Sequence, residues 1–129
     1  MLNVEPEYTE IPAQTLEQLE KFREEHADDE IGTIAQTVLF EDEKLRVWEM
    51  KLEPGESSDL HHHVNDYYLV IMSGDLVAGV PPKSSGMDIF AVRIPPEGNT
   101  VAIPKGGIEW AYNIGEKTYH EILIEMKDS

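Results

Sequence analysis

The chain has 129 residues, which is enough for one compact domain with a hydrophobic core and too few for two. Its 26 acidic residues outnumber its 10 basic ones and give a formal net charge of −16, which disfavours nucleic acid and anionic membrane surfaces as partners. The absence of cysteine excludes disulfides and thiolate chemistry, so a bound metal would need nitrogen and oxygen ligands. Because no signal peptide or membrane-spanning apolar run is evident, we expect a cytoplasmic protein.

Residues 1–32 are expected to form an N-terminal arm and one short helix. Pro6 and Pro12 interrupt a stretch without periodicity, which predicts an arm over residues 1–14 that lies on the surface or on a partner subunit. Thr15 is a candidate helix cap, with Gln18 at the capping-box position. Three apolar residues then follow at helical spacing, Leu16, Leu19 and Phe22.

Residues 33–129 are expected to form one β domain, because the apolar pattern there has a period of two. Turn signals such as Pro54-Gly55 and Gly74-Asp75 separate short strand-like segments. About nine short strands at this spacing predict an all-β sandwich or barrel. The expected strands are Thr33 to Phe40, Lys44 to Leu52, Asp59 to His63, Tyr67 to Met72, Leu76 to Val80, Met87 to Ile94, Thr100 to Ile103, Gly107 to Asn113 and Thr118 to Met126.

Three consecutive histidines stand where a turn opens into a strand. Strand alternation directs His61 and His63 to one face and His62 to the other. Two imidazoles placed two residues apart on a strand can reach a single metal ion. The alternative interpretation of the triplet is a solvated surface strand.

The segment around these histidines resembles the first motif of the cupin family, in which a glycine is followed by His-x-His, a glutamate and a second glycine. The matching residues are Gly55, His61, His63, Tyr67 and Gly74. The second cupin motif is similarly matched by Gly98, Pro104, Gly106, Glu109 and Asn113. The resemblance implies a double-stranded β-helix, the jelly-roll barrel of the cupins, with a small-molecule site in its mouth.

The sequence departs from the family pattern at two of the usual ligand positions. Tyr67 stands where the family has a glutamate, and Glu109 stands where it has a histidine. The resemblance therefore implies a metal site of His61, His63 and Glu109, whose two imidazoles and one carboxylate suit divalent iron, manganese, nickel or zinc. Tyr67 is a candidate catalytic residue, as a weak ligand, an acid/base group or a hydrogen-bond donor, and otherwise an amphipathic lining residue.

Alternation places Glu109 on one strand face with Ala111, and Trp110 on the other with Tyr112. The motif alignment favours Glu109 inside the barrel, with the aromatic pair packed against the N-terminal arm or a second subunit. The reverse orientation, with the aromatic pair in the core, is the alternative. The arm and the outward aromatic residues together predict a homodimer.

Two further residues are candidate catalytic groups. His120 shares strand parity with the apolar residues Ile122 and Ile124, so we expect it to point into the barrel as a site residue or as a hydrogen-bonded core residue. Arg46 shares parity with Trp48 and Met50, and an inward arginine would anchor a substrate carboxylate. The alternative for Arg46 is an exposed strand position.

The favoured function is a metal-dependent enzyme, an oxygenase, isomerase or lyase, that acts on a small polar and carboxylated metabolite. A non-catalytic small-molecule-binding protein is the first alternative, because two of the four ligand positions are altered. The second alternative is a metal-free isomerase or epimerase that uses the same polar side chains as acid/base groups.

Overall fold

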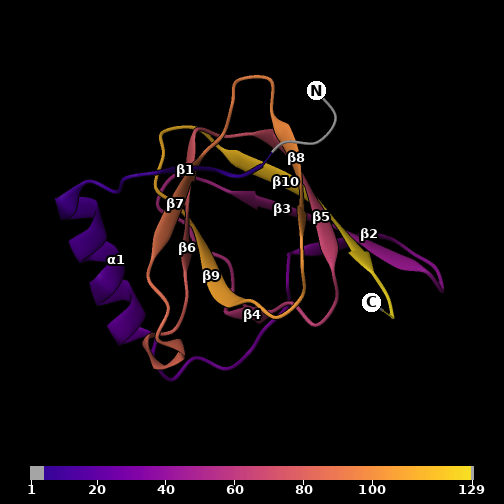
Figure 1. The fold of residues 1–129 in the computed structure, drawn as a ribbon, viewed down its shortest axis with the longest axis horizontal. Coiled ribbons are helices and arrows are strands. Elements are labelled where there is room, and N and C mark those ends of the chain that lie inside the picture. Colours follow the sequence, from indigo (N-terminus) through magenta and orange to yellow (C-terminus); the bar gives the residue numbers. More distant parts are fainter. Residues whose placement is uncertain (1–4, 129) are drawn as a thin grey trace.

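Two five-stranded antiparallel sheets face each other and enclose a barrel in the computed structural model, which describes residues 5–128 (Figure 1). The first sheet contains, in spatial order, β1 (Glu7–Thr9), β7 (Phe90–Arg93), β6 (Leu76–Val80), β9 (Ile108–Asn113) and β4 (His61–His62). The second contains β2 (Thr37–Glu41), β3 (Leu45–Leu52), β10 (Tyr119–Met126), β5 (Tyr67–Ser73) and β8 (Asn99–Ile103). The prediction of an all-β barrel with one short helix is confirmed.

The helix α1 (Ala13–Glu25) begins three residues earlier than predicted. Pro12 occupies the cap position without a side-chain hydrogen bond, and Thr15 lies inside the first turn, so the predicted Thr15 cap is wrong. A proline at this boundary has a backbone angle already suited to helix entry and no N–H group to satisfy. No helix among residues 5–128 is both long and apolar enough to cross a membrane.

The apolar side of α1 covers the outer face of the first sheet (Figure 1). Leu19 is only 1% exposed and packs in one cluster with Val80 and Trp110. The Phe22 ring meets the Trp110 ring edge-on at 5.4 Å and the Tyr112 ring at 5.1 Å. The outward aromatic pair of β9 therefore packs against the N-terminal region of its own chain, which is one of the two packing partners that the sequence predicted.

The N-terminal arm contributes a strand that the sequence pattern did not reveal. β1 pairs with β7 at the edge of the first sheet, with Tyr8 opposite Val92. A three-residue strand is too short to show periodicity, and Pro6 and Pro12 flank it closely. Residues 1–4 of the predicted arm lie outside the described residues.

The space between the two sheets holds a core of large apolar side chains and, toward one end, a polar cluster. Residues of alternating position on β3, β5 and β10 point inward and form the core, among them Met50, Leu52, Ile71 and Leu123. Inward positions of β4, β5, β9 and β10 carry polar groups instead.

Candidate functional site

The pairing of β4 with β9 brings the three predicted ligands together. His61 lies directly opposite Glu109 in the register of the two strands. Just beyond β4, the His63 N–H donates to the Gly107 carbonyl at 2.8 Å, and the Gly106 N–H donates to the His63 carbonyl at 2.7 Å. One ligand atom of each side chain, from His61, His63 and Glu109, lies within 4.8 Å of the others.

The histidine alternation is as predicted. His61 and His63 are 3% and 4% exposed, whereas the intervening His62 is exposed to solvent. The His63 ring stacks on the Tyr67 ring, with 4.0 Å between ring centroids, and meets the His61 ring edge-on. These contacts fix the orientation of both imidazoles.

A backbone acceptor orients the His61 ring. Its Nδ1 lies 2.9 Å from the Asp59 carbonyl oxygen, to which a protonated Nδ1 donates. This bond leaves Nε2 as the unprotonated nitrogen, which is the form that binds a metal. Burial lowers the pKa of His61, and it lowers the pKa of His63 to about 3 with help from the neighbouring histidines. Both rings are therefore neutral near pH 7 and available as ligands.

Glu109 supplies the carboxylate from the opposite strand. Burial raises the pKa of Glu109 to about 7, because water no longer solvates its charged form. Space for this side chain depends on Gly79 of the adjacent strand: a Cβ there would lie 2.7 Å from Glu109 Oε2 and even closer to the Phe90 ring. The missing side chain at position 79 thus makes room for the carboxylate beside the histidines.

Tyr67 is buried at the start of β5 and faces the same interior. Burial is the largest cause that raises the pKa of Tyr67 far above its ordinary value, followed by the charges of Glu109 and Glu121. Its hydroxyl is therefore neutral at physiological pH and able to donate a hydrogen bond. The structure thus places Tyr67 beside the three candidate ligands.

Two inward residues of β10 add to the polar cluster and were not predicted. The Tyr119 hydroxyl donates to Glu121 Oε1 at 2.5 Å, and both side chains are buried. Burial raises the pKa of Glu121 to about 7, a rise that the Tyr119 bond opposes and the charge of Glu109 reinforces. Strand parity could have predicted their inward orientation, because both residues alternate in phase with Leu123, which is buried.

The predicted orientation of His120 is wrong. Tyr119, Glu121 and Leu123 are the buried, inward residues of β10, so His120 points to the outer face. There its Nε2 lies 2.8 Å from Glu49 Oε2 on the neighbouring β3. The apolar residues that share strand parity with His120, and that had suggested an inward orientation, lie on the outer face of this sheet.

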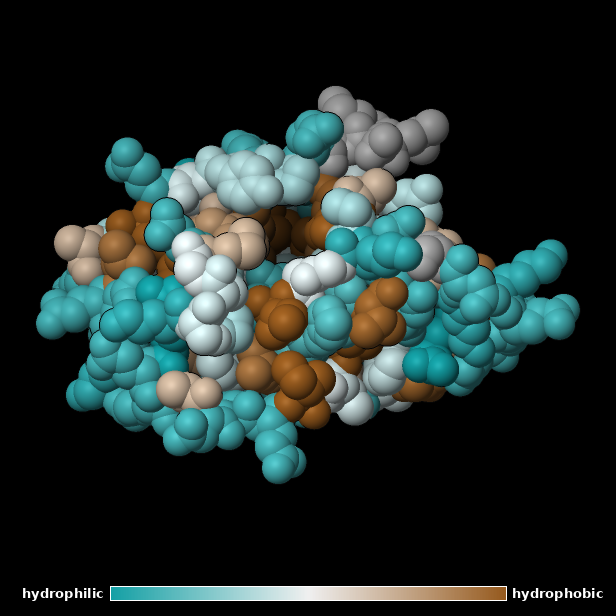
Figure 2. Space-filling model, turned by 60° about the horizontal axis from the view of Figure 1, so that its bottom comes forward, coloured by the Kyte–Doolittle hydropathy of each residue, from teal (hydrophilic) through white to brown (hydrophobic). Residues whose placement is uncertain are grey.

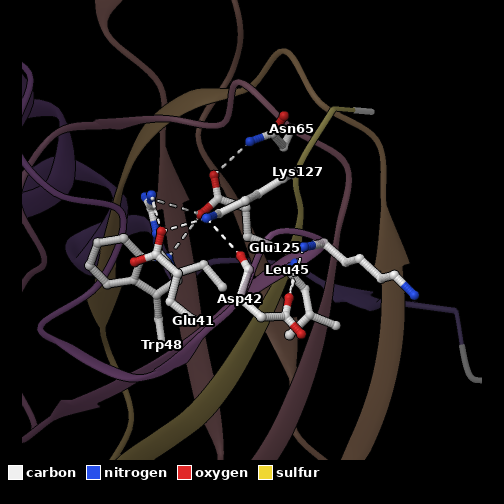
Figure 3. Close-up of polar contacts among 9 residues, drawn as sticks. Glu41, Asp42, Leu45, Trp48, Asn65, Glu125 and Lys127 are labelled. Atoms are coloured by element: carbon white, nitrogen blue, oxygen red, sulfur yellow. Dashed lines mark hydrogen bonds and ion pairs between the residues drawn. The ribbon is translucent and has the colours of Figure 1, made fainter.

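Arg46 shares the inner face with Trp48, as predicted, but its guanidinium is already paired. Arg46 Nη2 donates to Glu41 Oε2 at 2.9 Å, and Nη1 lies 3.7 Å from Glu125 Oε1. Glu125 also accepts bonds from Trp48 Nε1 at 3.0 Å and from Asn65 Nδ2 at 2.8 Å (Figure 3). Arg46 and then Lys127 lower the pKa of Glu41 to about 2. Arg46 thus belongs to an ion-pair network separate from the histidine cluster.

A surface groove with a volume of about 370 Å³ lies elsewhere, between β1, the start of α1 and β7. Its lining is mostly apolar and contains none of the clustered histidines or buried carboxylates. The clustered ionisable side chains thus lie in the barrel interior, apart from this groove.

Comparison with solved structures identifies the architecture. A cupin domain from Bordetella pertussis Tohama I superposes with a TM-score of 0.61 at 21% sequence identity, over 74% of this chain and 99% of that one. The chain has the cupin fold. An RmlC-like cupin with a double-stranded β-helix from Methanocaldococcus jannaschii gives a TM-score of 0.56 at 18% identity, over 76% of this chain and 87% of that one.

A third structure, an uncharacterized conserved protein with a double-stranded β-helix domain from Klebsiella pneumoniae, gives a TM-score of 0.57 at 15% identity over 81% of this chain and 85% of that one. No family model matches the sequence, and no curated protein matches it significantly. These likenesses concern the fold of the cupin barrel alone.

The donor set in this barrel fits a divalent transition metal. Two neutral imidazoles and one carboxylate can occupy one side of such an ion and leave positions open for a small ligand. The second ring nitrogen of His61 has the acceptor that metal-bound histidines normally require.

Proposed function

We propose that the protein binds one divalent transition metal ion through His61, His63 and Glu109 and uses this site on a small polar molecule. The observation that carries the proposal is the convergence of the three ligand atoms within 4.8 Å, from two buried histidines and one half-buried glutamate. A buried charged or polar group without a bound partner is costly, so a cation explains why these groups gather in the interior.

The carboxylate narrows the choice of metal. One carboxylate among two imidazoles makes the site harder than a three-histidine site and lowers the net charge of the complex, which favours iron or manganese over softer ions. When bound, such an ion polarises a carbonyl or phosphoryl oxygen, or activates a bound ligand. Oxygenase, isomerase and lyase reactions all use this capacity.

The chain's own residues would orient the ligand and move protons. Tyr67, stacked on His63, presents a neutral hydroxyl as a hydrogen-bond donor beside the candidate ligands. Glu121, held by Tyr119, places a second carboxyl group in the interior with a pKa near 7, where it can both accept and release a proton. We assign Glu121 an acid/base role and propose it, in place of His120, as the candidate catalytic residue of β10.

The nature of the small molecule follows from the charges around the site. Glu109 and Glu121 make the interior acidic. The expectation of a carboxylated substrate rested on Arg46 as its anchor, but Arg46 is paired with Glu41. The geometry thus supports a polar ligand without supplying a cationic anchor for a carboxylate. The surface at the β4 end mixes hydrophobic and hydrophilic residues (Figure 2), which suits a ligand with both kinds of group.

A metal-free isomerase or epimerase is the second candidate, because two carboxyl groups of the barrel interior have pKa values of about 7, as acid/base catalysts need. Elemental analysis of the purified protein separates the two candidates. One equivalent of iron or manganese supports the first, and a fully active protein that contains no metal supports the second.

Metal titration tests the ligand set. After chelation, titration with Mn²⁺ followed by calorimetry should show one site, and His61→Ala or His63→Ala should weaken it by about a hundredfold or more. His62→Ala is the matched control, because this exposed neighbour points away and its loss should leave the affinity unchanged. Equal binding by all three variants would refute the proposed site.

A further inference from the structure

The outer face of the second sheet carries an apolar row that crosses all five strands. The strand registers place five side chains next to one another from β2 to β8, namely Phe40, Val47, Ile124, Tyr68 and Ala102. Ile122 and Val70 lie side by side in the adjoining row. Phe40 is 53% exposed and Tyr68 is 44% exposed, so the row faces solvent in the single chain.

The two sheets differ in what covers them. The outer face of the first sheet also carries apolar side chains, and α1 covers them through Leu19 and Phe22. α1 is the only α-helix among residues 5–128, and Figure 1 shows it on the far side of the barrel from β2. A contiguous exposed apolar surface of this kind marks an interaction site in a soluble protein.

Charge indicates which partner the face accepts. Among the outward residues of its five strands, Glu49 is the only carboxylate, and it is paired with His120 and accompanied by Lys51. The face is therefore close to neutral, while the chain as a whole carries a net charge of −16. A basic partner would bind the acidic remainder of the surface, and an anionic membrane would be repelled by it.

We propose that the apolar row is a homodimer interface, in which the same face of a second copy packs against it about a two-fold axis. Such an arrangement places neutral surface against neutral surface and keeps the two acidic remainders apart. Packing of two sheets face to face is an established way to bury such a surface. The interface differs from the one expected at Trp110 and Tyr112, because α1 already covers those side chains.

Sedimentation equilibrium at micromolar concentrations tests the proposal. The wild-type protein should have twice the 14.6 kDa mass of one chain. Tyr68→Glu or Phe40→Glu should weaken the dimer by at least about tenfold, because each places a charge in the buried contact. Both positions are half-exposed in the single chain, so the barrel itself should remain folded, as circular dichroism and the thermal midpoint would show.

The control variant also replaces a tyrosine with glutamate, but on another surface of the protein. Tyr8→Glu replaces a side chain that is 68% exposed on β1 of the first sheet, and it should leave the dimer intact. A monomeric wild type, or a dimer that Tyr8→Glu disrupts while Tyr68→Glu does not, would overturn the proposal. So would a monomer that binds neutral phosphatidylcholine vesicles through Tyr68, since the face would then serve a membrane.

Discussion

Glu109 and Glu121 are two carboxyl groups in the same barrel interior, on strands from different sheets, and Glu121 is the more deeply buried of the two. Burial favours their neutral forms, and each has a pKa of about 7. A bound cation would reverse this preference for Glu109 and stabilise the carboxylate. The metal-free protein should therefore lose stability as the pH rises, and Glu121 allows this effect to be isolated without changing a ligand.

We predict that Glu121→Gln stabilises the metal-free protein at pH 8 and leaves its stability nearly unchanged at pH 4.5. The stability that neutral Glu121 contributes is fully present below the unfolded value of 4.5 and is lost as the pH rises through about 7. The difference between these two pKa values corresponds to at most about 3 kcal/mol in the free energy of unfolding. The glutamine side-chain oxygen can still accept the hydrogen bond from the Tyr119 hydroxyl. Urea unfolding at both pH values in a chelator measures the difference.

Glu97→Gln is the matched control, because this glutamate is exposed and its replacement should give no such pH-dependent difference. A Glu121→Gln variant that is less stable than wild type at pH 8 would show that the fold needs the ionised carboxylate. His61 and His63 are present in both proteins, so the opposite pH dependence of buried histidines cancels from the comparison.

The same residues show what the sequence can and cannot predict about the site. The spacing of His61 and His63 was sufficient to place both rings on one face, and the motif resemblance placed Glu109 opposite them. The alternation on β10 was assigned to the wrong face, because the rule that apolar residues point inward fails where a barrel encloses polar groups. Glu121 points inward, and Ile122 belongs to the outer apolar row.

At the scale of secondary-structure elements, α1 acts as the outer layer of the first sheet. Its Leu19 side chain fills a closed space against Trp110 and Val80, and Arg23 beside it donates to the carbonyls of Pro81 and Met87. β9 therefore carries Glu109 on one face and rests on the helix with the other. The helix supports the candidate site from outside the barrel.

Strand positions could be predicted from period-two patterns, because each long strand alternates over several residues. The short β1 and the start of α1 could not, since three residues show no period and Pro12 offers no side-chain cap to recognise. The contact between α1 and β9 was foreseen only as one alternative, because sequence alone does not show whether Trp110 meets its own chain or another.

Leu19→Ala should destabilise the protein by about 2–5 kcal/mol, because it leaves a cavity in a closely packed cluster. Leu16→Ala, in the same helix but 36% exposed, should cost less than about 1 kcal/mol. Chemical unfolding of both variants measures the difference. Similar losses for the two variants would indicate that α1 does not pack on the first sheet in the way described.

The whole molecule combines two apolar outer faces with an acidic remainder. One face is covered by α1, and the other is the apolar row assigned to a second copy. The surplus of 26 acidic over 10 basic residues leaves most exposed carboxylates without a cationic partner. Repulsion among them opposes the compact state and, to a smaller degree, the approach of two copies.

Salt should therefore stabilise this protein. Raising NaCl from 0.1 to 1 M shortens the screening length from about 10 Å to about 3 Å and weakens repulsion between exposed carboxylates. We expect the thermal midpoint of the chelated protein to rise, measured at one fixed protein concentration. In the double variant Glu25→Lys, Glu97→Lys, both changes lie at exposed positions and replace a negative with a positive charge, so the rise should be smaller. An equal rise in both proteins would assign the effect to hydration, and a fall in the wild type would show that attractive ion pairs such as Lys127 with Glu41 outweigh the repulsion.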